Sequence, residues 1–92
     1  MMTANEARVA TIDRLATMAK EFILNNTGIS IQDAIDNGHF YTTVSFEGVP
    51  NPEKTGAEVV RQLEEKGFEA EHVYYDGPNG YDNYILIKWE AD

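Results

Sequence analysis

Cysteine is absent from this chain of 92 residues. Its absence excludes disulfides, thiol catalysis and zinc–thiolate sites together. Cations are also scarce, because 7 lysines and arginines stand against 16 carboxylates and the net charge is −9. Such a surface repels nucleic acid and anionic membranes, since binding to phosphates needs clustered cations. The acidity either attracts a basic partner or only keeps the protein soluble.

Long apolar runs are missing as well. No stretch approaches the ~20 residues of a membrane-spanning helix. The first 14 residues also lack the apolar core of a signal peptide, because charges interrupt every candidate segment. We therefore expect a cytoplasmic protein that does not bind membranes.

No set of residues resembles a catalytic or metal-binding constellation. The only histidines are His39 and His72, and a zinc or general-base role needs further ligands or an orienting partner. The carboxylate pairs fall on faces that we expect to be solvated, where none has an apolar pocket. The glycines of residues 76–80 lie between two predicted strands without a lysine, unlike a phosphate-binding loop. We predict that the protein is not an enzyme and uses no cofactor or metal.

Helical patterns fill the first part of the chain. Thr3 and Glu6 form a capping box, and apolar residues then recur at spacings of three and four, which predicts a long N-terminal helix over residues 3–25. We expect this helix to end at residues 25–28, with Gly28 in the left-handed conformation. A short helix over residues 30–37, capped by Ser30 and stopped by Gly38, should follow.

Residues 39–92 read as a β-α-β-β unit. Alternation over residues 39–47 predicts a strand with four residues facing the core: Phe40, Thr42, Val44 and Phe46. Asn51 and Pro52 should cap and begin a helix that ends near residue 66. Strands over residues 68–75 and 83–89 should form a hairpin about the turn at residues 76–80.

The expected fold is therefore α+β, with two N-terminal helices before the β-α-β-β unit in a single domain, residues 1–92. Residues 84–87 are the most apolar strand segment, as is typical of a central strand. This predicts a three-stranded antiparallel sheet of order 1-3-2 with helices packed on it. We expect Leu86, in the middle of that strand, to be buried.

Two surfaces are candidates for binding. The long helix carries a stripe with the spacing of a coiled-coil seam: Val9, Ile12, Ala16, Ala19 and Ile23. This stripe either packs on its own sheet or pairs with another copy, which would make a homo-oligomer. The second surface is the sheet face opposite the helices, with its candidate partner residues: Tyr41, Tyr75, Trp89, Glu69 and Glu71. That face is exposed unless the first helix covers it, and Tyr and Trp are enriched at protein interfaces.

Four short motifs add a resemblance. Residues 2–8 open the long helix, residues 38–40 (Gly-His-Phe) begin a strand, residues 65–68 (Glu-Lys-Gly-Phe) end a helix, and residues 87–89 (Ile-Lys-Trp) close the last strand. In these motifs the chain resembles small proteins encoded by tailed bacteriophages. The resemblance implies an accessory protein, of a kind that often binds host proteins, and it carries over no functional residue.

We thus predict a non-enzymatic, acidic phage accessory protein that binds a host macromolecule, of the host-takeover or anti-defence type. One alternative is an oligomeric protein that sequesters a nucleotide-like ligand, which would need a pocket lined by Arg8 and Arg14. Another is a minor component of the virion or of its assembly.

Overall fold

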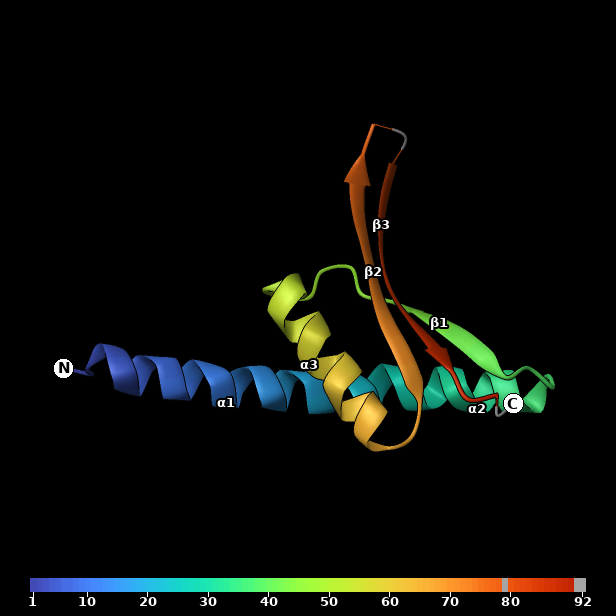
Figure 1. Ribbon diagram of the computed structural model, residues 1–92, viewed down its shortest axis with the longest axis horizontal. Coiled ribbons are helices and arrows are strands. Elements are labelled where there is room, and N and C mark those ends of the chain that lie inside the picture. The colour runs from blue at the N-terminus through green and yellow to red at the C-terminus, as the bar shows by residue number, and fades with distance from the viewer. Residues whose placement is uncertain (79, 91–92) are drawn as a thin grey trace.

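One long helical rod begins the fold. In the computed structural model, α1 (Ala4–Phe22), the π-helical segment η1 (Ile23–Thr27) and α2 (Gly28–Asp36) follow one another without a break (Figure 1). The capping box of Thr3 and Glu6 is confirmed. The predicted break between two helices is wrong, because Gly28 keeps a right-handed helical φ of −59°. The wider π turn keeps the asparagines of this stretch within the helix.

The rod ends where the sequence predicts. Gly38 has a φ of 76°, a left-handed conformation that glycine adopts without a Cβ penalty. The N–H groups of Gly38 and His39 donate to the carbonyls of Ile35 and Ala34, which is the Schellman arrangement of a helix end. A helix over residues 4–36 is about 50 Å long at 1.5 Å per residue. The rod therefore accounts for the longest dimension of the molecule, 53 Å.

The sheet has the predicted topology. The structure describes residues 1–78 and 80–90, so Asn79 of the predicted turn lies outside the described residues. Strands β1 (Tyr41–Ser45), β2 (Glu69–Gly77) and β3 (Gly80–Lys88) form an antiparallel sheet in the order β1-β3-β2. This arrangement confirms the α+β fold and the central position of the last strand.

Helix α3 (Pro52–Glu65) connects β1 to β2. It begins at Pro52 as predicted, but Asn51 does not cap it with its side chain. The backbone of Asn51 is left-handed, with a φ of 47°, and this conformation lies outside the extended region typical of a capping residue. The hydroxyl of Thr55 instead ties the helix to the preceding loop by donating to the carbonyl of Pro50 at 2.8 Å.

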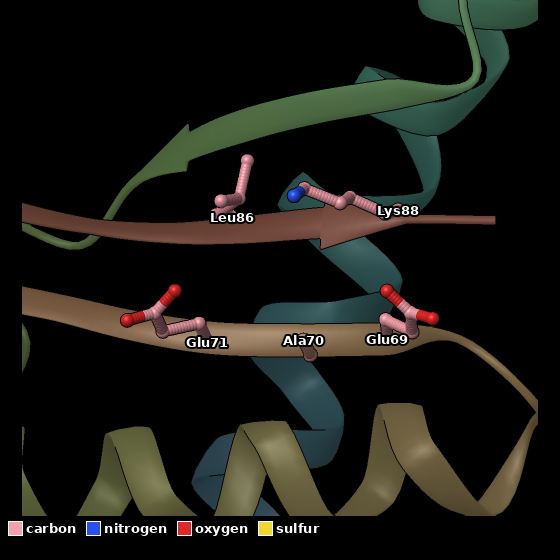
Figure 2. Close-up of a pocket in the computed structure, with 5 residues that line it drawn as sticks. All are labelled: Glu69, Ala70, Glu71, Leu86 and Lys88. Carbon is pink, nitrogen blue, oxygen red and sulfur yellow. The ribbon is translucent and has the colours of Figure 1, made fainter. Parts of the chain in front are cut away.

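The rod and α3 cover the same face of the sheet, and the core lies between these layers. Figure 2 views the open face of the sheet, with the rod behind the strands and α3 beside β2. Register sets the core face, because residues opposite each other in an antiparallel pair point to the same side. The buried residues of the core cluster come from α1, α3, β1, β3 and the position just after β1: Ala19, Val44, Phe46, Val59, Leu63, Ile85 and Ile87.

Three expectations about burial are corrected. Leu86 lies on the open face and is only half-buried, since its neighbours Ile85 and Ile87 are the residues that face the helices. Phe40 precedes β1 and is 54% exposed. Trp89 packs against the core cluster, edge-on to Phe68 with ring centroids 6.1 Å apart, so it does not belong to the open face.

In the part of the chain that the structure describes, no helix combines the length and the apolarity needed to cross a bilayer.

Candidate functional site

The arrangement nearest to a catalytic pair is a partly buried network around His72. Its Nε2 lies 2.7 Å from Oδ1 of Asn83, and Nδ2 of Asn83 donates to the carbonyl of Phe46 at 3.1 Å. Because the amide must turn its Nδ2 to the carbonyl, its oxygen faces the ring and Nε2 of His72 carries the hydrogen. Across the described residues, no hydroxyl is hydrogen-bonded to this imidazole. The network fits a structural role in joining β2, β3 and the end of β1.

Aromatic contacts surround this network. The ring of Phe46 meets that of Phe22 edge-on at 4.8 Å and that of His72 at 5.0 Å, and His72 lies 5.7 Å from Tyr74. The row of rings connects the rod to β2 through the core. Such packing holds the imidazole in one orientation.

The other histidine, His39, is exposed and lies two residues before β1, with its ring centroid 5.9 Å from that of Tyr41. No group of three or more potential metal ligands occurs among residues 1–78 and 80–90.

The open face of the sheet gathers most of the predicted partner residues. Register places Tyr41 and Glu69 on either side of Lys88, and Glu71 opposite Leu86. Tyr75 lies farther along the same face and is 53% exposed. Four of the five predicted residues therefore share this face, and Trp89 does not.

A shallow hollow of about 140 Å³ lies on this face, lined by Glu69, Ala70, Glu71, Leu86 and Lys88. Figure 2 shows both carboxylates turned toward β3. A wider hollow of about 420 Å³ adjoins it and is lined by Phe40, Tyr41, Leu86, Lys88 and Glu90. The two hollows share Leu86 and Lys88, which makes them one shallow band suited to a macromolecular surface more than to an enclosed small ligand.

Leu86, Lys88 and Phe40 belong to this surface, and sequence reasoning missed them. Residues 84–87 are all apolar, so their alternation gives no sign of which residues face the helices. The exposed position of Phe40 follows from its place just before the strand.

The N-terminal part of α1 is also exposed. Every residue from 1 to 14 is exposed, and Figure 1 shows the helix projecting well beyond the sheet and α3. Val9 and Ile12 are 52% and 59% exposed, whereas Ala19 is fully buried and Ile23 packs against the core. The predicted stripe is thus divided, with its C-terminal half on its own sheet and its N-terminal half in solvent.

Arg8 and Arg14, the cations that a nucleotide pocket would need, do not line the same hollow among the described residues. Arg8 bonds to Asn5 on the exposed helix at 3.3 Å. Arg14 lines a hollow between the rod and the loop before α3, and Glu21 and Glu47 line the same hollow. Their carboxylates would oppose a bound phosphate.

One exposed ion-pair cluster lies on α3. Arg61 bonds to Glu58 and Glu65 one turn away on either side. The hydrogen bond from Arg61 holds the pKa of Glu58 below its usual range. These pairs are solvated and belong to the helix surface, where they contribute little.

Comparison with models of known protein families, with curated proteins and with solved structures finds no match for this chain. Function is therefore inferred from geometry and sequence.

Proposed function

We propose that this protein is a non-enzymatic binding module that docks on a partner protein through the projecting N-terminal part of α1. The observation that carries the proposal is the division of the apolar stripe. Val9 and Ile12 continue the line of residues that packs on the sheet, yet they lie more than half exposed in solvent. Exposed apolar area is unfavourable at roughly 25 cal/mol per Å². A groove that accepts one face of a helix would cover it.

The projecting segment is built to stay helical without a covering layer. A capping box closes its first turn, and Ala4, Ala7 and Ala10 supply strong helix formers. The packed half of the rod provides the helical nucleus, so extension costs no new nucleation. A helix stabilised in this way is ready to be bound without a large ordering cost.

The charges of this segment balance. Residues 4–14 carry Glu6, Asp13, Arg8 and Arg14, whereas the whole chain has a net charge of −9. Recognition at the segment therefore depends on apolar burial, and the acidic remainder of the surface steers toward basic partners. Together with the resemblance to phage accessory proteins, these features favour a host protein as partner and the host cytoplasm as the place of action.

The test is site-specific photocrosslinking in host cells. A photoreactive residue at position 12 should capture one defined protein, and the same residue at position 10, about 160° around the helix, should not. The captured protein, once purified, should bind the wild-type chain and the Ala10→Glu variant, and it should lose affinity at least tenfold for Ile12→Glu. Equal capture from both positions, or equal binding by both variants, would count against the proposal. Capture of only this same chain would show that the helix mediates self-association instead.

A further inference from the structure

Strand β1 is an edge strand, and within the described residues no strand pairs with its outer side. The N–H of Phe46 donates to the carbonyl of Asn83 at 2.9 Å. The even-numbered residues of the strand are therefore in the hydrogen-bonded pairs with β3. The odd-numbered residues direct their N–H and C=O groups away from the sheet: Tyr41, Thr43 and Ser45. In the described chain no backbone hydrogen bond reaches these groups from the far side.

This edge also lacks the features that keep sheet edges apart. Residues 41–45 (Tyr-Thr-Thr-Val-Ser) include no charge and no proline, whereas the other edge strand, β2, carries Glu69 and Glu71 on the open face. Natural edge strands are usually protected by charges, prolines or bulges. Between Phe22 and Phe46 the only charged residues are Asp33 and Asp36. The free edge therefore lies in the least charged part of a strongly acidic chain.

We propose that β1 pairs with β1 of a second copy, antiparallel about a two-fold axis at Thr43, so that the two sheets become one continuous sheet. In this register Thr43 lies opposite Thr43 of the second copy, and Tyr41 lies opposite Ser45 of the second copy. Each of these pairs exchanges two backbone hydrogen bonds. A two-fold axis needs only one self-complementary strand. The register satisfies every outward backbone group of the strand.

The charges at the ends of the paired strands favour a second copy of this chain as the partner of β1. The same register brings His39 of each copy opposite Glu47 of the other. Both residues are exposed, and neither takes part in an ion pair within the described residues. An imidazole and a carboxylate form a hydrogen bond, which becomes an ion pair when the imidazole is protonated. Opposite ends of one strand are thus complementary to each other, as a symmetric pair requires.

The rod supplies support behind the joined edge. It passes behind the strands, contacts β1 through α2, and re-emerges beyond β1 (Figure 2). A strand added at this edge therefore has a helix behind it instead of water. Ile35 of α2 is 51% exposed in the single copy, so this helix carries apolar area that one copy alone leaves in solvent.

Net charge opposes the pairing, since each copy carries −9. The repulsion is long-range and is screened beyond about 8 Å at physiological salt. The dimer should therefore tighten as salt is added. Pairing at β1 leaves the projecting part of α1 free, so it is independent of the proposed binding by that helix.

Cysteine crosslinking tests the register, because the chain contains no cysteine of its own. Cα atoms of a hydrogen-bonded antiparallel pair lie about 5.5 Å apart, within the range of a disulfide. Thr43→Cys should form a disulfide dimer under mild oxidation. Ser45→Cys is the matched control, because its counterpart is displaced by four residues, about 13 Å, along the strand pair. Crosslinking of Ser45→Cys but not of Thr43→Cys would overturn the register.

Sedimentation at low micromolar to high micromolar concentration tests the dimer itself. Wild type should approach twice the monomer mass of 10.3 kDa. Thr43→Pro removes only an outward N–H, so it should give monomers with unchanged circular dichroism. Glu47→Lys should weaken the dimer at least fivefold, and His39→Glu added to it should restore pairing. A monomeric wild type at high concentration would overturn the proposal, as would a dimer broken by Ile12→Glu but intact in Thr43→Pro.

Discussion

Gly56 and His72 pack so closely that no side chain fits between them. A Cβ added to Gly56 would lie 2.2 Å from Nδ1 of the imidazole. Gly56 is buried in α3, and His72 is held on its other side by the hydrogen bond to Asn83. The glycine is therefore required by the approach of α3 to β2, although alanine is the better helix former.

Two glycine substitutions should consequently have opposite effects. Gly56→Ala should lower the free energy of unfolding by about 2 kcal/mol or more, because the ring must move. Gly28→Ala should raise it by about 0.5–1 kcal/mol, since its Cβ would meet only the Ile23 carbonyl at an ordinary 3.6 Å. Urea denaturation of both variants measures the difference. A stabilised Gly56→Ala protein would show that α3 lies farther from β2.

Removal of the Asn83 side chain should be costly. Asn83→Ala leaves the Nε2 hydrogen of His72 and the carbonyl of Phe46 without the partners that they have in the wild type. We expect the free energy of unfolding to fall by about 2–4 kcal/mol, because buried polar groups without a partner carry their full desolvation penalty. The neighbouring exposed residue gives the control, and Asp82→Ala should change the urea midpoint little. Similar midpoints for the two variants would contradict the structural role of the network.

Thr27 offers a stabilising change. Its side chain is fully buried at the end of the π segment, and within the described residues its hydroxyl has no hydrogen-bond partner. Thr27→Val replaces the hydroxyl with a methyl group of similar size. The free energy of unfolding of this variant should rise by about 1 kcal/mol, which a higher melting temperature would reveal. Thr27→Ser keeps the hydroxyl and removes the methyl, so it should be less stable than wild type. A destabilised Thr27→Val protein would indicate that the hydroxyl has a partner.

Adjacent residues of β3 should differ in their contribution to stability. Ile87→Ala leaves a cavity at a fully buried position and should lower the free energy of unfolding by about 2–5 kcal/mol. Leu86→Ala affects the half-buried open face and should cost about 1 kcal/mol. Chemical denaturation of the two variants under the same conditions tests which face carries the core. Equal losses would indicate that a further layer covers Leu86.

Local signals in the sequence determined much of this fold. The capping box at Thr3, the glycine stop at Gly38 and Pro52 at the start of α3 were all predictable, because each acts within a few residues. The apolar run at residues 84–87 also indicated the central strand. Strand alternation put Glu69, Glu71 and Tyr75 on one side of their strand, and the register of the sheet placed Tyr41 on the same face.

Tertiary structure decided the rest. Residues 25–28 resemble a helix end, yet they stay helical because Ile23 and Ile31 on either side pack against the same core. The apolar run at residues 84–87 fits either face, and only the approach of the helices selected Ile85 and Ile87. The division of the α1 stripe likewise depends on where the sheet ends. The periodicity of apolar residues indicates which side chains can be buried. The surface that buries them comes from segments distant in the chain, so no local sequence pattern predicts it.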